Sequence, residues 1–305
     1  MSAPSRLQPP TATGKTSSDG KGGAPQNGAT AKQRRGSVRY HLLMTLAAFT
    51  WLVPMVWMLS MALTPNSVLQ QSSTSLLPSK VTLSNFAGVF SQGDLGRWFL
   101  NSFVVTTLTT IITVLFCAMA GYAFAKIHFP GRRALFVVTL AGLMVPKEAM
   151  FVPLFLMISN ANLQNTYPAL ILPRLAAPLG VFIMTQFFSK VPVEVDEAAE
   201  LDGAGPWRVF WSIMLPLARP AMASLAIFTF VLTWNDFLWP LVASTKTEWF
   251  TVTTGLASLQ SNFAATTNLG DIMARGLVGS LPLIVVFLIF QRQLIRGITL
   301  GSGEK

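Results

Sequence analysis

Cysteine and histidine are nearly absent from this chain, and charged residues are few. The 305 residues include one cysteine, Cys117, and two histidines, His41 and His128. One cysteine cannot form an internal disulfide framework, and three such residues are too few for a convincing Cys/His metal site. Only 11% of the residues are charged, whereas soluble domains carry about 25%. We therefore expect no metal, no disulfide framework and no ordinary soluble domain, and we interpret Cys117 as a packing residue.

The sequence also lacks the residues of a nucleotide-binding or hydrolytic site. Gly14-Lys15-Thr16 is similar to the end of a phosphate-binding loop, but the first glycine of that motif would fall on Pro9. No pair of carboxylates stands near a histidine in a plausible cleft. We expect no catalytic residue and no bound cofactor on this chain.

Six long apolar segments dominate the sequence after residue 41. Hydrophobic residues make up 51% of the chain, and its mean hydropathy is +0.52. Each segment is close to the roughly 20 residues that a helix needs to cross a bilayer. The predicted fold is all-α, a polytopic membrane protein with six transmembrane helices. We place these helices at about 42–63, 98–125, 134–158, 167–188, 220–241 and 272–295.

Polar residues flank this hydrophobic region at both ends. Residues 1–40 contain too few large apolar side chains to offset the entropy of folding, so we expect a disordered tail. The length of this polar leader and the lack of a small-residue cleavage site argue against a removed signal peptide. The region of six helices then covers 41–296, and 297–305 form a second, short tail.

The distribution of positive charge predicts the orientation of the helices. Six spans place both termini on one side of the membrane. With the tails and the second and fourth loops in the cytoplasm, 16 of the 22 Lys and Arg residues lie on that side. Cytoplasmic loops carry such an excess. We therefore expect both termini in the cytoplasm, and we attribute the net charge of +10 to membrane orientation rather than to nucleic-acid binding.

The fourth loop, residues 190–219, is the main polar feature. Five of the twelve acids lie within nine of its residues, at Glu194, Asp196, Glu197, Glu200 and Asp202. Acids suit the first turn of a helix, where they oppose the positive end of its dipole. An acidic cluster of this density requires water or a partner protein.

The local sequence of this loop predicts two short helices joined by a turn. Pro192 suits the first turn of one helix, and Gly203 can end it because glycine adopts backbone angles that other residues avoid. Pro206 can open a second helix. Its apolar residues recur at helical spacing and predict one aromatic face: Trp207, Phe210, Trp211 and Met214.

The spacing within this helix-turn-helix is similar to that of a known motif. The order is Glu197-Ala198-Ala199, three residues, Gly203, nine residues, Ile213, one residue and Leu215-Pro216. On these residues the chain resembles the inner-membrane permease subunits of bacterial ABC importers, whose EAA loop has this pattern. Glu-Ala-Ala alone carries little information, whereas the extended pattern between two apolar segments is specific. The alternative is an ordinary amphipathic cytoplasmic hairpin.

Further stretches resemble the carbohydrate-type branch of this family. They are Asn101-Ser102, Gly121 to Ala125 with Phe129 to Arg132, and Trp234 to Phe237. The end of the chain, from Gln291 to Lys305, is similar to the tail of the maltose-permease-like subunit, except that Glu304 stands where an apolar residue is expected. The likeness covers about 42–305.

The resemblance implies a function and a set of partners. The chain would be the permease subunit of an ATP-driven importer that moves a sugar or related polyol across the bacterial inner membrane by alternating access. The partners would be a second permease subunit, two ATPase subunits that use ATP and Mg²⁺, and an extracytoplasmic solute-binding protein. The residues implied to couple to the ATPase are Glu197, Ala198, Ala199, Asp202, Gly203, Ile213, Leu215 and Pro216.

Polar residues in or near the apolar segments are candidates for the substrate path, because such groups are costly in a membrane. Trp234, Asn235 and Asp236 combine an aromatic ring with hydrogen-bonding groups, as a sugar site requires. Alternatively, they lie at the outer interface, where tryptophan anchors helices. Arg174 and Glu148 are further candidates, and their alternative roles are capping of free carbonyls and snorkelling at the membrane edge.

Other functions remain as alternatives at this point. Cations in or near the spans, at Lys147, Arg174 and Arg275, are compatible with glycerol phosphate or an anionic sugar as substrate. A stand-alone ion-coupled carrier would show inverted repeats with buried carboxylates. A membrane-embedded enzyme would carry catalytic residues on its spans. The sequence displays neither feature, so the importer subunit is the favoured prediction.

Overall fold

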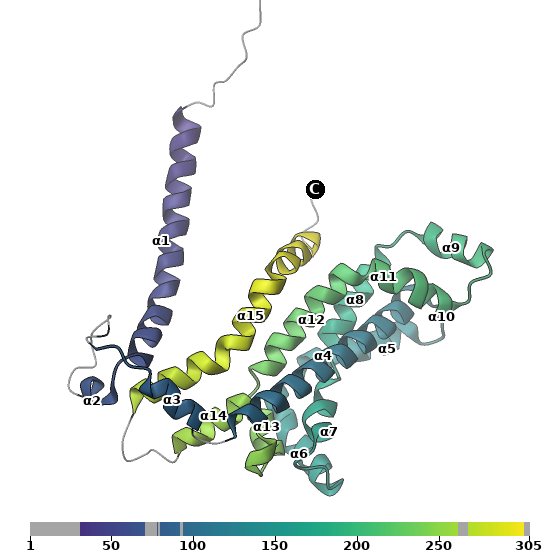
Figure 1. Ribbon diagram of the computed structural model, residues 1–305. Helices are drawn as coiled ribbons and strands as arrows, with labels where there is room; N and C mark the ends of the chain where they lie inside the picture. The colour runs from purple at the N-terminus through teal and green to yellow at the C-terminus, as the bar shows by residue number, and fades with distance from the viewer. Residues whose placement is uncertain (1–30, 71–77, 79, 92–93, 262–267, 302–305) are drawn as a thin grey trace, which may run out of the picture. The chain divides into compact units, whose positions relative to one another are not determined.

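The computed structural model describes residues 31–70, 78, 80–91, 94–261 and 268–301 (Figure 1). Within these ranges all regular structure is helical, as the sequence predicts. The chain divides into two compact units, residues 1–53 and 54–305. All of the sites analysed below belong to the second unit. Most of the predicted N-terminal tail and the last four residues lie outside the described ranges.

Three helices are long and apolar enough to cross a membrane without a break. They are α1 (Ala31–Ala62), α4 (Leu95–Lys126) and α15 (Leu269–Gly301). They correspond to the first, second and sixth predicted spans. The helices extend beyond the predicted spans at both ends of the chain: residues 31–40 are helical where a disordered tail was predicted, and residues 297–301 are helical within the predicted C-terminal tail. Residues such as Ala31, Lys32 and Gln33 favour helix and extend the first span outward.

Three further spans are pairs of helices that meet at a sharp bend. The first joins α5 (Arg132–Ala141) and η1 (Gly142–Met144) to η2 (Lys147–Met150) and α6 (Phe151–Asn160) at 96°. The second joins α7 (Tyr167–Ile171) and η3 (Leu172–Arg174) to α8 (Pro178–Ser189) at 51°. Counting each pair as one span gives up to six, the predicted number.

Proline accounts for the first two bends. Pro146 and Pro178 each follow a residue that has left the helical region: Val145 has ψ 117° and Ala177 has ψ 78°. The proline ring clashes with a helical residue before it and provides no N–H for the helix. The helices therefore break where the sequence places these prolines.

The third bent pair lies between the polar loop and the fifth span. Here α10 (Pro206–Val209), the π-helix η4 (Phe210–Met214) and α11 (Leu215–Leu217) meet α12 (Arg219–Trp234) at 74°. The prediction of one continuous helix over 220–241 was wrong. Residues 235–237 separate α12 from α13 (Leu238–Ala243). Asn and Asp side chains compete with helical hydrogen bonds, which explains the break at Asn235-Asp236.

The core of the second unit forms where α4 packs against α8 and α12. Small residues make up the contact surface of α4, including Cys117, Ala118 and Gly121, all buried. A Cβ added to Gly180 of α8 would lie 2.6 Å from the sulfur of Cys117. Small side chains allow membrane helices to approach closely and to gain van der Waals contacts. Cys117 is a packing residue, as predicted.

Two polar residues near the start of α4 hold the segment that leads into α14. At its start, Asn101 donates hydrogen bonds to the carbonyls of Glu248 and Phe250, at 2.9 and 3.0 Å. Ser102 accepts one from the backbone N–H of Val252 at 2.7 Å. These two residues thereby fix η5 (Thr247–Trp249) and the start of α14 (Val252–Ser261).

A second set of amides fixes the start of α15. The side chain of Asn66, in α2 (Asn66–Leu69), donates to Asn85 of α3 (Ser84–Ser91) and to Asp271 of α15, both at 3.2 Å. Asn85 in turn donates to the carbonyls of Ala62 and Thr64. The N-terminal turn of α15 is therefore attached to the segment that follows α1.

We predict that Gly121→Ala destabilises the second unit. A Cβ at this position would lie 2.6 Å from the Cβ of Met184 and 2.8 Å from the backbone of α8, so the two helices must separate. Overpacking of this kind costs about 1–3 kcal/mol. Thermal unfolding of the purified protein in detergent measures the effect. The matched control is Gly96→Ala on the same helix, where no atom lies within 4 Å, and an equal shift for both variants would contradict the prediction.

Candidate functional site

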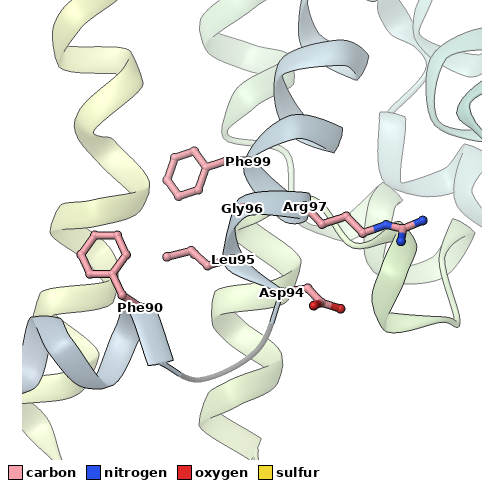
Figure 2. Close-up of a pocket in the computed structure, with 6 residues that line it drawn as sticks. All are labelled: Phe90, Asp94, Leu95, Gly96, Arg97 and Phe99. Carbon is pink, nitrogen blue, oxygen red and sulfur yellow. The ribbon is translucent and has the colours of Figure 1, made fainter.

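The structure contains a cleft at the start of α4, of about 550 Å³. Figure 2 shows that its apolar side chains, Phe90, Leu95 and Phe99, point to one side of the chain, whereas Asp94 and Arg97 point to the other. The polar groups do not converge on a common point. The cleft therefore does not form a polar binding site. The polar loop is the stronger candidate for a functional site.

The first helix of the polar loop, α9 (Val193–Leu201), follows Pro192 and carries acids in its first turn, as predicted. It ends at Gly203, whose φ of +73° is in the left-handed region. The N–H of Ala204 bonds to the carbonyl of Ala199, and that of Gly203 to the carbonyl of Glu200, both at 2.9 Å. This pair of bonds is the Schellman C-cap, which favours glycine at this position.

The second helix of the loop opens at Pro206, also as predicted, but its aromatic residues do not share one face. Phe210 and Met214 are buried, whereas Trp207 is 65% and Trp211 47% exposed. The prediction of a single aromatic face was wrong. The π-helical turn over Phe210–Met214 has more residues per turn than an α-helix, so side chains at α-helical spacing diverge.

The buried side chains of the loop pack against the ends of α4 and α8. Tyr122 of α4 contacts Phe210 and Phe188, with ring centroids 5.4 and 5.9 Å apart. Ala199 of α9 and Met214 belong to the same cluster. Burial of this aromatic surface fixes the second helix of the loop on the bundle and brings α9 beside α4.

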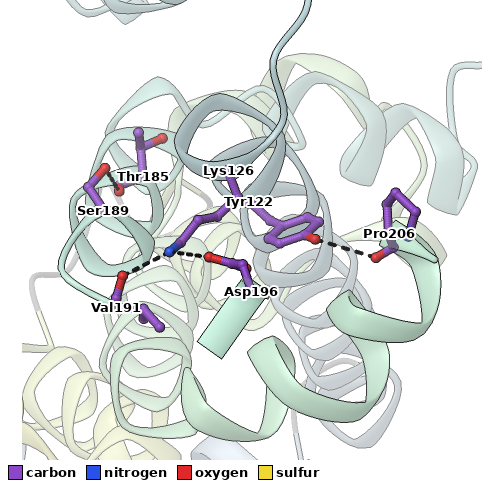
Figure 3. A network of polar contacts seen from close by, with 7 residues as sticks. All are labelled: Tyr122, Lys126, Thr185, Ser189, Val191, Asp196 and Pro206. Carbon is purple, nitrogen blue, oxygen red and sulfur yellow. Dashed lines mark hydrogen bonds and ion pairs between the residues drawn. The ribbon is translucent and has the colours of Figure 1, made fainter. Parts of the chain in front are cut away.

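An ion pair ties the first turn of α9 to the last residue of α4. The Nζ atom of Lys126 lies 2.6 Å from a carboxylate oxygen of Asp196 and 2.8 Å from the carbonyl of Val191 (Figure 3). The exposed fractions of the two charged side chains are 10% and 22%, so solvent screens the pair less than a surface pair. Nearby, the hydroxyl of Tyr122 donates to the carbonyl of Pro206 at 3.5 Å (Figure 3).

The sequence did not reveal this pair. All of the acids appeared available for a partner, but Asp196 is bonded within the chain. The sequence feature that could have indicated the pair is Lys126, a cation at the end of an apolar span, next to the Gly121 to Ala125 motif.

The eight predicted coupling residues divide into an exposed set and a supporting set. Glu197, Ala198, Asp202, Gly203 and Pro216 are exposed, Ala199 is buried, and Ile213 and Leu215 are half-buried.

Two apolar side chains of α9 also face solvent. Leu201 is 89% and Val193 62% exposed, and neither was predicted as a site residue. The outer surface of α9 therefore combines carboxylates with exposed apolar groups. Such a surface fits a partner whose apolar pocket has a basic rim.

Two candidates for the substrate path meet in the structure. Arg174, at the end of η3, forms an ion pair with Asp236, in the turn after α12. Their side chains are 22% and 14% exposed. The backbone carbonyl of Asp236 also accepts a hydrogen bond from Thr253 at 2.8 Å. The pair joins the bend of the fourth span to the break between α12 and α13, and the Asp236 carbonyl connects this break to α14.

The other three candidates do not join this pair. Trp234 is only 3% exposed, and its indole N–H bonds to the carbonyl of Gly279 at 3.1 Å. Its ring is a packing element, so the expected aromatic platform is not accessible here. Asn235 bonds back to the carbonyl of Val231, and Glu148 is exposed in η2, just after the first bend.

The sequence matches one family model over residues 118–300, described as the binding-protein-dependent transport system inner membrane component. Three curated relatives cover most of the chain. A diacetylchitobiose uptake permease of Streptomyces coelicolor is 36% identical over 90% of this chain and 91% of its own length. A trehalose transport permease of Mycobacterium tuberculosis is 35% identical over 88% and 98%. A glycerol-3-phosphate transport permease of Yersinia pestis is 31% identical over 88% and 98%.

Solved structures of a bacterial alginate importer have a similar fold. One superposes with a TM-score of 0.74 at 20% identity and covers 86% of this chain and 98% of its own. A second, whose periplasmic protein holds an alginate pentasaccharide, gives 0.55 at 17% identity over 88% and 99%. At these identities the likeness establishes the fold.

We predict that Lys126→Gln and Asp196→Asn each loosen α9. Each change removes a hydrogen bond between charged groups, worth about 1.5–3 kcal/mol. The free energy of local opening measured by hydrogen exchange at the amides of residues 193–201 should fall by that amount, so these amides exchange faster. Exchange in α12 should stay unchanged. Lys190→Gln, at an exposed lysine of the same loop, is the control. If all three variants exchange alike, the ion pair does not hold α9.

Proposed function

The chain belongs to the family of binding-protein-dependent transport system inner membrane components, and on that premise we propose that α9 is the segment through which separate ATPase subunits drive this permease. The chain is a transporter subunit of an ABC importer rather than an enzyme. The stand-alone carrier and the membrane-embedded enzyme are therefore set aside.

The observation that carries the proposal is the attachment of α9 to two spans at once. Its first turn is bonded to the end of α4 through Lys126, and its C-terminal side continues through α10 and α11 into α12. A force applied to the exposed surface of α9 is thereby transmitted to two helices that pack against each other. Figure 1 places α9 at the end of the bundle, away from α7 and α13.

The orientation and the partners follow from this role. The excess of cations puts α9 and both termini in the cytoplasm, where ATP is available. The two ATPase subunits supply ATP and Mg²⁺ chemistry, and a second permease subunit completes the conduit. An extracytoplasmic solute-binding protein delivers the substrate to the opposite end, as the periplasmic protein of the alginate importer is seen to bind a sugar chain.

The proposed substrate is a sugar or a related polyol. Relatives that carry diacetylchitobiose and trehalose support this class, whereas the relative that carries glycerol 3-phosphate supports the anionic alternative. The pairing of Arg174 with Asp236 favours a neutral substrate, because the guanidinium is already neutralised by a carboxylate. The paired groups can still hydrogen-bond hydroxyl groups through their remaining donors and acceptors.

We predict that Gly203→Pro abolishes uptake while the protein stays in the membrane. Proline cannot adopt φ +73° and lacks the N–H that bonds Glu200, so the cap of α9 is lost. Gly203→Ala should have a smaller effect, since the left-handed conformation costs an L-residue roughly 1–2 kcal/mol. Substrate uptake and ATP hydrolysis by the reconstituted assembly are measured together.

Gly205→Ala provides the matched control for this test. Gly205 has φ −70°, which any residue adopts, and no atom lies within 4 Å of an added Cβ. Its uptake should equal that of the wild type. Normal uptake by Gly203→Pro would overturn the role assigned to α9, as would cross-links from Ala198 that reach no ATPase subunit.

We predict different outcomes for stability and uptake when the Arg174–Asp236 pair is changed. Removing one partner leaves an uncompensated buried charge, which costs about 3–5 kcal/mol, whereas neutralising both is milder. The double variant Arg174→Gln with Asp236→Asn should therefore unfold at a higher temperature than either single variant. Uptake should remain low in all three if the pair lines the substrate path. Recovery of uptake along with stability would limit the pair to a structural role.

A further inference from the structure

The polar loop has two limbs of opposite charge. The acidic limb, residues 193–202, contains five acids and no cation. The basic limb, residues 206–219, contains Arg208 and Arg219 and no acid. Both arginines are exposed. The two limbs are therefore suited to different partners, and the coupling role of α9 concerns only the first.

The direction of the basic limb follows from its bend. Residues Pro206–Leu217 meet α12 at 74°. Transmembrane helices tilt by about 20° from the bilayer normal on average. Since α12 packs along α4 as one of the spans, a segment at this angle runs nearly parallel to the membrane plane. It also lies beside Arg219, the exposed first residue of α12, and a cation is less costly at the headgroups than in hydrocarbon.

The exposed side chains of the basic limb are those of an interfacial helix. Trp207 and Trp211 are 65% and 47% exposed, one turn apart. They are not needed for the core, because Val209, Phe210 and Met214 fill the cluster on the bundle side. Tryptophan prefers the headgroup region, where its ring is half-solvated. Arginine binds phosphate oxygens in a bidentate geometry.

We propose that the basic limb is a lipid anchor, with Trp207 and Trp211 in the headgroup region and Arg208 and Arg219 bound to the phosphates of anionic lipids. The acidic limb is repelled by the same headgroups and projects into the aqueous phase. The anchor gives α9 a fixed support on the membrane surface, so that a push on α9 moves α4 and α12 rather than rotating the whole loop.

This assignment depends on α4 and α12 being membrane spans. It takes from the proposed function only the choice of the cytoplasmic leaflet, whose lipids are anionic. A protein partner on the basic limb is the competing outcome. Charge complementarity favours lipid, because the limb carries cations alone and the aromatic residues that accompany interface anchoring.

The test removes the single native cysteine and attaches a fluorescent label to a cysteine introduced at a chosen position. In a Cys117→Ser background, Trp211→Cys or Trp207→Cys receives the label, and Leu201→Cys on the acidic limb is the matched control at 89% exposure. The full-length protein is reconstituted into phosphatidylcholine vesicles with phosphatidylglycerol. Two vesicle preparations are compared, in which either phosphatidylcholine or phosphatidylglycerol carries a nitroxide quencher close to the headgroup. Two label positions on the basic limb keep the test independent of the folding of any one variant.

Lipid quenching should be strong at positions 207 and 211 and absent at 201. Labelled phosphatidylglycerol should quench better than labelled phosphatidylcholine, and Arg208→Gln should reduce that preference about fivefold, the worth of one cation at an anionic surface. Equal quenching of labels at 201 and 211 would overturn the proposal. So would a label at 211 that lipid does not quench but that added ATPase subunits cover. Neither result would contradict the coupling role of α9. That role is tested separately by the uptake of the Gly203 variants.

Discussion

The rest of the structure depends on the junction between the end of α4 and the polar loop. Two kinds of contact form it: the aromatic cluster around Tyr122 and the ion pair of Lys126 with Asp196. The apolar contact gives adhesion without a fixed direction, whereas the ion pair and the carbonyl of Val191 fix the position of α9. A helix that transmits force, as we propose for α9, requires both kinds of contact. It must stay attached to the bundle and must keep its angle to α4 while it moves. We propose that external work enters the bundle through this junction, because it attaches α9 to two helices of the bundle.

The bends of three spans have a second consequence. A helix that breaks inside a membrane leaves backbone groups that hydrocarbon cannot satisfy, so the break must lie against protein or water. Two of the bends in this chain are next to candidates for the substrate path: Glu148 lies in η2 after the first bend, and Arg174 ends η3 before the second. Broken helices occur at the binding sites of other transporters for this physical reason. The unbroken helix α4 provides the rigid element against which α8 and α12 pack.

We propose a separate task for each limb of the polar loop. Its acidic limb offers carboxylates together with the exposed Leu201, while its basic limb offers tryptophan and arginine. The Schellman cap at Gly203 lies between them and orients one limb relative to the other. We therefore propose a functional role for Gly203, although it has no side chain and open space around it. Its contribution is a backbone angle rather than a contact.

The sequence by itself determined the features that depend on neighbouring residues. Hydropathy marked six spans, proline marked the start of each limb, and Gly203 marked the end of α9, because these effects act within a few residues. Only the tertiary structure decided which distant residues meet. Lys126 and Asp196 are 70 positions apart, Arg174 meets Asp236 although α8 to α12 lie between them in the chain, and Trp234 is buried by α15 rather than open to a substrate. Periodicity also failed at Trp207 and Trp211, where a π-helical turn changed the spacing. Such pairings follow from how helices pack in three dimensions, and no local pattern encodes them.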